Sequence, residues 1–185
     1  MVLYGTKNLT DDRQAYDLLT EAAEEHWYLS PLPEICREAG GKPFFPGLAH
    51  RQFNLSHSGS MALCGLDSAP LGVDIQVVKQ WRTGLPGRVC CQAELDWLGR
   101  QPDPQLGFAI LWALKEARVK QSGLGLRTQI REIHIPLPEQ WDSPVLLDQL
   151  WFRVYTGERW AAAACALTPP PEKILWRTVN LSPVF

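Results

Sequence analysis

The sequence of 185 residues has no apolar run that approaches the ~20 residues of a membrane-spanning helix. Its first ten residues, MVLYGTKNLT, also lack the basic start and apolar stretch of a secretory signal. The five cysteines form no C-x-x-C pair and are odd in number, which argues against a zinc site and predicts reduced thiols. We therefore expect a soluble, cytoplasmic protein that does not span a membrane.

Other absences narrow the function. No serine lies in a G-x-S-x-G sequence, so a hydrolase nucleophile of that type is disfavoured. The four histidines suggest no metal-binding triad. There is no recognised nucleic-acid-binding module and no array of basic residues interleaved with aromatic ones, so a nucleic-acid partner is not expected.

What the sequence does contain is typical of a folded globular protein. Hydrophobic residues make up 45% and charged residues 21% of the chain, and eight tryptophans supply large packing surfaces. The net charge is -2, but the segment from 79 to 131 has nine basic and four acidic residues, which favours an acidic or phosphorylated partner. The nine are Lys79, Arg82, Arg88, Arg100, Lys115, Arg118, Lys120, Arg127 and Arg131.

Periodic patterns predict a mixed helix and strand protein. Helical spacing is found at 11–26, 32–39, 86–99 and 108–121. Short apolar or alternating runs predict strands at 53–55, 61–66, 71–77, 131–135, 149–155 and 160–167. We expect the first three strands to form a meander, because short turn sequences separate them.

Two segments resemble each other within the chain. Residues 58–66 and 156–167 each read as a turn, then a strand, then Cys-x-Leu, at Cys64 and Cys165. Both cysteines are expected to be small core residues. The similarity gives modest support to an internal duplication.

The segment LWALKEARVK, residues 111–120, places charged residues inside an apolar helix. At 3.6 residues per turn, Trp112, Glu116 and Lys120 share one stripe, while Leu111 and Leu114 can face a core. An exposed ion pair between Glu116 and Lys120, contributing about 0.2–0.5 kcal/mol, is the simplest interpretation of this helix alone.

A second motif, LGVDIQ at residues 71–76, has the alternation of a strand. Alternation sends Val73 and Ile75 to one face, and Asp74 and Gln76 to the other. Two side chains with oxygen atoms are thus expected side by side. A half-buried strand with a polar outer face would give the same pattern.

Three motifs follow one another in order: Ser-His-Ser at 56–58, Gly-Val-Asp-Ile-Gln at 72–76, and Trp-x-x-Lys-Glu-x-x-x-Lys at 112–120 ahead of the glycine-rich turn at 123–126. Together they resemble the surfactin-type 4'-phosphopantetheinyl transferases, over about residues 41–167. Any one motif would be weak evidence, but three in order are specific.

The resemblance implies an α+β fold in which two similar halves are related by a pseudo-twofold axis. Each half is expected to be a small, mainly antiparallel sheet packed with helices. We expect an N-terminal half at 1–78, on the coenzyme A side with the Asp motif at its end. The C-terminal half, at 79–185, is expected to carry the Lys-Glu helix and the segment that faces a carrier protein. Such two-half proteins are expected to be monomers.

The resemblance also implies an activity: transfer of the phosphopantetheine arm of coenzyme A to a serine of an apo acyl or peptidyl carrier protein, with release of 3',5'-ADP. Mg²⁺ is the implied metal, and it prefers oxygen ligands. Asp74 and Glu116 are the implied ligands. Gln76 stands where the family has most often Glu, and its carbonyl oxygen is a neutral candidate third ligand. The acidic helix of a carrier protein would suit the basic segment.

The remaining roles are also carried over by resemblance. Glu116 is the best candidate for the general base, with Asp74 and Lys120 completing the catalytic set; Lys120 would contact a phosphate or protonate the leaving group. The residues expected to bind coenzyme A are Arg13, Lys42, Ser56, His57, Lys115 and Lys120. Each has a plainer explanation, such as a solvated loop lysine for Lys42 or a turn cap for Ser56. Glu94 is a weaker candidate for an additional carboxylate near the site.

Two other functions stay open from the sequence. Gln76, together with an N-terminus that is short beside those of larger relatives, is consistent with a weakened coenzyme A binding or regulatory protein. A Mg²⁺-dependent phosphohydrolase would use the same carboxylates with water as the nucleophile. A test of transfer to apo-carrier proteins separates all three.

Overall fold

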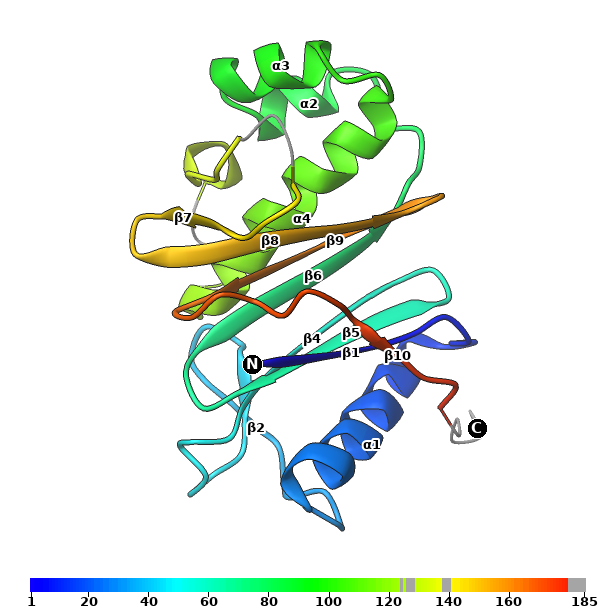
Figure 1. Ribbon diagram of the computed structural model, residues 1–185, viewed down its shortest axis with the longest axis vertical. Helices are drawn as coiled ribbons and strands as arrows, with labels where there is room; N and C mark the ends of the chain where they lie inside the picture. The colour runs from blue at the N-terminus through cyan, green and yellow to red at the C-terminus, as the bar shows by residue number, and fades with distance from the viewer. Residues whose placement is uncertain (124, 126–128, 138–140, 180–185) are drawn as a thin grey trace.

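The protein contains two four-stranded sheets that lie between two principal helices, as the computed structural model shows (Figure 1). The structure describes residues 1–123, 125, 129–137 and 141–179. The lower part of Figure 1 holds the first sheet with helix α1, and the upper part holds the second sheet with helix α4.

The first sheet has the strand order β10-β1-β5-β4. Its strands are β1 (Val2–Thr6), β4 (Gln52–Ser58), β5 (Met61–Asp67) and β10 (Leu175–Trp176). Only β10 runs parallel to its neighbour, β1. A 3-10 turn, η1 (Asp12–Gln14), leads into helix α1 (Ala15–Trp27), which packs on one face of this sheet. A small hairpin of β2 (Cys36–Arg37) and β3 (Pro43–Phe44) follows α1.

The second sheet has the strand order β6-β9-β8-β7 and is entirely antiparallel. Its strands are β6 (Leu71–Val77), β7 (Val145–Leu147), β8 (Leu150–Gly157) and β9 (Trp160–Ala166). Helix α4 (Pro104–Ser122) packs against β6 and β9. Two short helices, α2 (Leu85–Val89) and α3 (Gln92–Gly99), lie at the N-terminal end of α4, and a 3-10 turn, η3 (Ile130–Glu132), comes after it in the chain.

The two halves repeat one arrangement, which confirms the expected fold. The order β1, α1, β4, β5 in the first half corresponds to β6, α4, β8, β9 in the second. In each half the last strand lies between the other two, as β1-β5-β4 and as β6-β9-β8. Cys64 on β5 packs in the cluster around α1, and Cys165 on β9 packs in the cluster around α4. The internal similarity seen in the sequence therefore reflects two equivalent hairpins.

The core consists of three clusters of buried side chains. One lies between α1 and the first sheet, one lies between α4 and the second sheet, and the third lies between the two sheets. On β9, Ala161 and Ala163 face α4, whereas Ala162 and Ala164 face the first sheet. Both faces of the central strands are therefore buried, which explains why they read as nearly continuous apolar runs.

The ends of α4 follow ordinary capping chemistry. The carboxylate of Asp103 accepts hydrogen bonds from the backbone N–H groups of Gln105 and Leu106, and Pro104 occupies the first helical position. Gly123 ends the helix with φ of 71°, a left-handed conformation that glycine adopts without steric cost. The long apolar helix is thus held between two well-defined ends.

Several secondary-structure predictions were wrong. Residues 32–39 form no helix; Cys36 and Arg37 lie in β2 instead. The helix expected at 86–99 is two helices, because Cys90 is extended (φ -101°, ψ 140°) and interrupts them. No strand forms at 131–135; Arg131 and Glu132 belong to η3 instead. The sequence also gave no signal for β1, β7 or β10.

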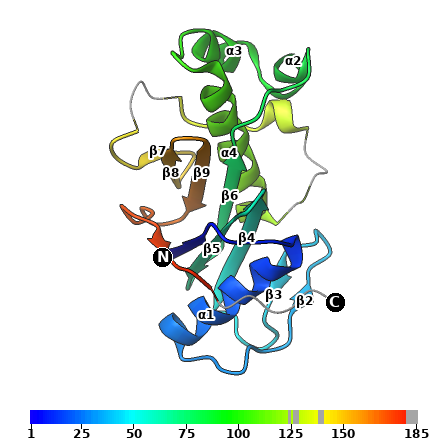
Figure 2. The ribbon, with the colours of Figure 1, turned by 90° about the vertical axis from the view of Figure 1, so that its right-hand side faces the viewer.

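The expected meander was wrong in a way that matters for the site. Strand β6 leaves the first sheet and pairs with β9, so it belongs to the second sheet. It still runs beside β4, whose side chains accept hydrogen bonds from its backbone: Asn54 Oδ1 from Val73 N (2.8 Å), Ser56 Oγ from Ile75 N (3.2 Å) and Ser58 Oγ from Val77 N (3.0 Å). Side chains of β4 rather than backbone pairing therefore join the two sheets. Figure 2 shows β6 beside β4.

The expected boundary between residues 78 and 79 stays a prediction, and β6, on its N-terminal side, pairs with a strand from beyond it. In the part of the chain that the structure describes, no helix is both long enough and apolar enough to cross a membrane.

Candidate functional site

A cavity of about 380 Å³ opens where the two halves meet. It is bounded by the start of α1, the β2–β3 hairpin, β4 and the C-terminal part of α4. Its polar walls include Tyr16, Arg37, Lys42, His57, Glu116 and Lys120. The cavity wall thus contains residues of the Ser-His-Ser and Lys-Glu motifs, together with residues of the start of α1 and of the β2–β3 hairpin, which the motifs do not include.

Asp74 lies at the inner side of this region, on β6, with only 2% of its surface exposed. Its Oδ1 accepts hydrogen bonds from Lys120 Nζ and from Ser56 Oγ, both at 2.7 Å. Its Oδ2 accepts one from Gln76 Nε2 at 2.7 Å. A buried carboxylate with three hydrogen-bond donors is held in one orientation.

Glycine at position 72 explains how β6 comes close enough to α4. A Cβ atom at Gly72 would lie 1.9 Å from the carbonyl oxygen of Ala117, which no side chain tolerates. The glycine of the Gly-Val-Asp motif therefore permits the close approach of strand and helix. This approach places the carboxylate of Asp74 within reach of Lys120, one helical turn after Glu116.

Glu116 is half-buried on the stripe of α4 that faces the cavity. Burial raises the pKa of Glu116, the negative charge of Asp74 raises it further, and the ammonium of Lys120 lowers it in part. Two carboxylates thus influence each other across the space between strand and helix. Such a pair favours a bound cation or a proton on one of its members.

Lys120 joins the two motifs. Its Nζ donates to Asp74 Oδ1 at 2.7 Å and to the carbonyl oxygen of Val73 at 3.2 Å, and its side chain is 25% exposed. The simple helical ion pair between Glu116 and Lys120 is not among the ion pairs of the described residues. Lys120 instead reaches across to the strand while lining the cavity.

Gln76 lies next to Asp74, as strand alternation predicted, and donates its amide to that carboxylate. It does not line the cavity but a smaller, adjacent hollow of about 180 Å³. We name this hollow the aromatic groove; its walls include Gln76, Lys79, Trp81, Gln105, Phe108 and Trp112. In the conformation observed, the side chain of Gln76 orients Asp74.

Ser56 and His57 of the Ser-His-Ser segment make different contacts. Ser56 is buried, donates to Asp74 and accepts from the backbone of Ile75, so it holds the acid in place. His57 points to the cavity, is 42% exposed, and has its Nδ1 3.3 Å from Asp12 Oδ1. Of these two residues, only His57 lines the cavity.

Lys42 is buried rather than solvated. Its Nζ donates to the carbonyl oxygens of Leu71 and Gln121, each at 3.0 Å, so it ties the start of β6 to the end of α4. Burial lowers the pKa of Lys42. The side chain also lines the cavity. An ammonium has three donors, so one remains for a ligand there.

Lys115 lies on the other face of α4, away from the cavity. It is fully buried, with its Nζ 2.8 Å from Glu94 Oε1 and within 3.1 Å of the carbonyl oxygens of Ile130 and Ile133. Glu94 also accepts a hydrogen bond from the backbone N–H of Cys91 at the start of α3. The pair connects α3, α4 and the η3 turn, and it does not face the cavity walls described above.

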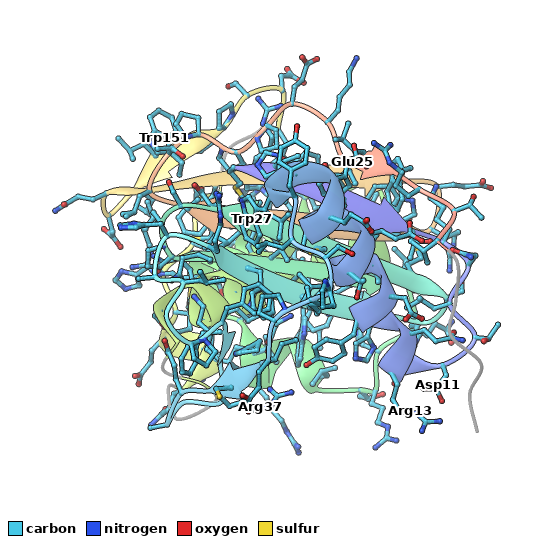
Figure 3. The ribbon with its side chains drawn as sticks, turned by 90° about the horizontal axis from the view of Figure 1, so that it is seen from below. Asp11, Arg13, Glu25, Trp27, Arg37 and Trp151 are labelled. Atoms are coloured by element: carbon cyan, nitrogen blue, oxygen red, sulfur yellow. The ribbon has the colours of Figure 1, made fainter. Side chains whose placement is uncertain are left out.

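Arg13 and Arg37 lie along the same side of the molecule (Figure 3). Arg13 is 68% exposed and donates to Asp11, and it is not part of the described cavity wall, although its neighbour Asp12 is. Arg37 is on the wall, where it donates to Tyr16 Oη at 3.0 Å and to the carbonyl oxygen of Gly41 at 2.9 Å.

Sequence reasoning missed Arg37, Tyr16 and Asn54 at this site. The mistaken helix at 32–39 concealed Arg37. The alternation of Asn54, Ser56 and Ser58 along β4 was a usable signal, since it places three polar side chains on one face. Of the glycine-rich turn, Gly123 and Gly125 line the cavity, whereas Leu124 and Leu126 lie outside the described residues, as does Arg127 of the basic segment.

Among the described residues, no cluster of three or more His, Cys, Asp or Glu side chains could hold a metal ion. Mg²⁺ commonly takes one or two protein carboxylates and completes its shell with phosphate oxygens and water. Asp74 and Glu116 supply such a pair at the edge of a cavity that also carries cationic side chains. The arrangement suits a ligand that contains phosphate.

Comparison with known proteins gives a consistent result. Residues 70–172 match the 4'-phosphopantetheinyl transferase superfamily. The chain is 36% identical over 142 residues to the 4'-phosphopantetheinyl transferase Sfp of Bacillus subtilis (strain 168), which covers 72% of the chain and 63% of that relative. It is 32% identical over 136 residues to a 4'-phosphopantetheinyl transferase of Bacillus subtilis, covering 70% and 61%.

A third relative is the 4'-phosphopantetheinyl transferase AcpT of Salmonella typhimurium, 37% identical over 134 residues, or 69% of each chain. The chain thus spans about three fifths of the length of the two Bacillus relatives.

Proposed function

The chain belongs to the 4'-phosphopantetheinyl transferase superfamily, and from this premise we propose that it transfers the 4'-phosphopantetheine arm of coenzyme A to a serine of an apo acyl or peptidyl carrier protein, releasing 3',5'-ADP. One observation carries the proposal. Asp74 from β6, and Glu116 and Lys120 from α4, converge beside a single cavity at the junction of two similar halves.

Mg²⁺ is the proposed cofactor, and the residues present fit it. Glu116 is half-buried beside a second carboxylate, and its pKa is raised by burial and by that negative charge. Asp74 and Glu116 would hold the ion, and Gln76 could add its carbonyl oxygen after rotation of its amide. When bound, the ion would neutralise charge that develops on the diphosphate during transfer.

The chemical step can be written with this chain's own residues. The carrier serine oxygen attacks the phosphorus that bears the pantetheine arm; the new P–O bond forms as the bond to 3',5'-ADP breaks. Glu116 takes the serine proton, directly or through water, and Lys120 places positive charge beside the departing phosphate. Ser56 keeps the carboxylate of Asp74 in its orientation throughout.

The nucleotide is proposed to occupy the cavity of about 380 Å³. His57 and Arg37 present exposed cationic or hydrogen-bonding groups to it, and Lys42 has one donor left. Arg13, at the start of α1, is proposed to reach the ligand only from the rim, because it does not form part of the described wall. The predicted role of Lys115 at coenzyme A has no support in its position.

The carrier protein is proposed to approach from the side of α2. Lys79, Arg82 and Arg88 are exposed there, close in sequence to the aromatic groove. They offer positive charge to an acidic helix. We also propose that the protein is a monomer located in the cytoplasm.

The decisive experiment is mass spectrometry of apo-carrier proteins after incubation with the protein, coenzyme A and Mg²⁺. The expected result is a mass increase of one phosphopantetheine arm on a single serine, with one 3',5'-ADP released per arm. Omission of Mg²⁺, and a carrier with that serine replaced by alanine, are the controls.

Other outcomes would favour the rival functions. Binding of coenzyme A without modification of any carrier in a broad panel would point to a binding or regulatory protein. Release of phosphate from simple phosphate esters, with no carrier present, would point to a phosphohydrolase.

A further inference from the structure

The cavity that is proposed to hold the nucleotide has a carboxylate on its wall that the proposed chemistry does not use. Asp12, the first residue of η1, lines the cavity, and its side chain is 72% exposed. Its Oδ1 lies 3.3 Å from Nδ1 of His57, which lines the same cavity. A carboxylate repels phosphate, so its presence in a cavity for a phosphorylated ligand requires an explanation.

The cavity lies beside β4, the strand at one end of the order in the first sheet, and reaches both faces of that strand. Phe53 and Leu55 pack in the cluster around α1, whereas Ser56 donates to Asp74 on β6. Strand alternation therefore places His57 on the face toward α1. The cavity thus has an α1 side, which includes His57, and a second side at the proposed metal site.

Each cationic group at the α1 side has an acidic partner from the chain itself. The Oδ1 atom of Asp11 accepts hydrogen bonds from the side chain and from the backbone N–H of Arg13, both at 2.9 Å, and Figure 3 shows the two residues together at the start of α1. His57 has Asp12 as its partner. The backbone N–H of Asp11 donates to the side chain of Gln14. Positive charge on this side is therefore balanced before any ligand binds.

The wall formed by the β2–β3 hairpin is different. Arg37 donates only to neutral groups, the hydroxyl of Tyr16 at 3.0 Å and the carbonyl oxygen of Gly41 at 2.9 Å. Lys42 likewise donates to carbonyl oxygens. In the part of the chain that the structure describes, neither cation forms an ion pair. The hairpin therefore offers charge to an anionic ligand, and the α1 side offers much less.

We propose that Asp12 is a specificity-determining residue: it weakens selection for the 3'-phosphate of coenzyme A, so that 3'-dephospho-coenzyme A is a second substrate. The inference rests on the proposed function for the identity of the ligand. With the diphosphate beside Asp74 and Glu116, the phosphate on the ribose is the anionic group that can reach the α1 side. There it meets the negative charge of Asp12 and an imidazole that Asp12 already holds.

Transfer from the second substrate follows the same course as transfer from the first. The carrier serine oxygen forms a bond to the phosphorus that bears the arm, the bond from that phosphorus to the nucleotide breaks, and Glu116 takes the serine proton. Because the 3'-phosphate is missing, the nucleotide released is AMP rather than 3',5'-ADP. The 3'-phosphate takes no part in these bond changes, so its absence should affect binding more than the chemical step.

The first test measures binding and needs no turnover. Calorimetry would compare coenzyme A with 3'-dephospho-coenzyme A in the wild type and in Asp12→Ala. The two Kd values should lie within about tenfold in the wild type, and Asp12→Ala should bind coenzyme A about fivefold more tightly with the other Kd unchanged. Glu24→Gln is the matched control, because it removes the same charge from an exposed position near the other end of α1.

A double-mutant cycle tests whether Asp12 acts through the histidine. In a His57→Gln background, Asp12→Ala should change the Kd for coenzyme A by less than about twofold, because the imidazole that Asp12 holds is no longer present. The gain in the wild-type background should also decrease at high salt concentration, since it is electrostatic and lies at an exposed site. An equal gain in both backgrounds would overturn the proposal.

Two further results of the binding test would overturn it. One is a wild type that binds coenzyme A more than about tenfold more tightly than its 3'-dephospho form. The other is a change in Asp12→Ala that is equal for both nucleotides, or absent for both. Thermal melting of each variant shows whether it is folded; should Asp12→Ala not fold, Asp12→Asn is read in the same way.

The second test measures transfer to an apo-carrier from each nucleotide. In the wild type the kcat values should agree within about threefold, with the remaining difference in KM, and one AMP should be released per arm transferred from 3'-dephospho-coenzyme A. Transfer from coenzyme A alone would overturn the proposal. Absence of transfer from both nucleotides, with the binding results as expected, would instead count against the proposed function.

Discussion

Helix α4 carries two lysines, five residues apart, each paired with a carboxylate at almost the same distance. Lys115 Nζ lies 2.8 Å from Glu94, and Lys120 Nζ lies 2.7 Å from Asp74. Five residues correspond to about 140° around a helix, so the pairs lie on opposite sides. The pair at Lys115 is fully enclosed, whereas Lys120 is one quarter exposed and borders the cavity.

The two pairs also differ in their other partners. Lys115 uses its remaining donors on the carbonyl oxygens of Ile130 and Ile133, which leaves none for a ligand. Lys120 keeps a donor toward the cavity after binding Asp74 and Val73. The same kind of ion pair is therefore fully used in packing on one side of the helix, whereas on the other side its lysine keeps a hydrogen-bond donor that faces the cavity.

The largest effect should separate the pairs by activity. Asp74→Asn and Glu116→Gln are expected to lower kcat/KM for transfer by about 10³-fold or more, equivalent to about 4 kcal/mol, because both carboxylates would hold the metal. Glu94→Gln should leave the rate per folded molecule within a few-fold of the wild type. Initial rates of arm transfer, measured by mass spectrometry, give the values. Full activity in either of the first two variants would contradict the site.

For stability we expect the opposite order: loss of the Lys115 pair should cost more than loss of the Lys120 pair. Lys115→Met leaves Glu94 buried without its cation and is expected to lower the free energy of unfolding by about 3 kcal/mol. Lys120→Met should lower it by much less, because Asp74 keeps its hydrogen bonds from Ser56 and Gln76. Urea denaturation gives both values. The double variant Lys115→Met/Glu94→Met should recover much of the loss; a further loss there would mean that the ion pair itself is not responsible.

A smaller effect concerns Ser56, which donates to Asp74 of the Lys120 pair and has no contact with the Lys115 pair among the described hydrogen bonds. Ser56→Ala removes a donor to Asp74 and an acceptor for the N–H of Ile75, and should lower stability by about 1–2 kcal/mol. Ser58→Ala removes one half-buried acceptor, for Val77, and is the control. If the two variants are equally stable, the buried contact with Asp74 contributes nothing measurable.

The smallest expected effect is an increase in thermal stability, in the variant Glu116→Gln. Burial and Asp74 raise the pKa of Glu116 in the folded protein, so its ionisation opposes folding without metal. Stability due to this group is present below its unfolded pKa and is lost as pH rises through the folded value. Glu116→Gln should therefore raise Tm at pH 8 in the presence of a chelator, and raise it less near pH 4. Glu94→Gln should lower Tm at pH 8; a fall in both variants would remove the contrast.

Much of the fold could be predicted from the sequence because local periodicity was strong. Strands β4, β5, β6, β8 and β9 and helix α4 all appear where alternation or helical spacing placed them. The failures have a physical cause. Strand β10 pairs with β1, which lies almost at the other end of the chain, and β6 pairs with β9 rather than with β5, the strand before it in the chain. A local sequence pattern reveals neither pairing, because both depend on contacts between distant segments.

The candidate site was partly predictable for the same reason. Strand alternation placed Asp74 and Gln76 side by side, and helical spacing placed Glu116 and Lys120 on one stripe. Lys115 was predicted to bind coenzyme A. It lies four residues after Leu111, whose side chain was expected in the core, so the helix period already indicated that Lys115 would be buried as well. The wall formed by Arg37 and Tyr16 depends on a hairpin meeting a helix, which no spacing in the sequence reveals.

The row of Asn54, Ser56 and Ser58 along β4 has one more consequence, for the chain's behaviour in a crowded cell. Strand β6 borders its sheet, and a bordering strand with free N–H groups is a template on which a foreign strand can add. Oxygen atoms from the neighbouring strand cover alternate N–H groups of β6, at Val73, Ile75 and Val77. The polar seam that supports the acidic residue thereby also protects against intermolecular association and aggregation.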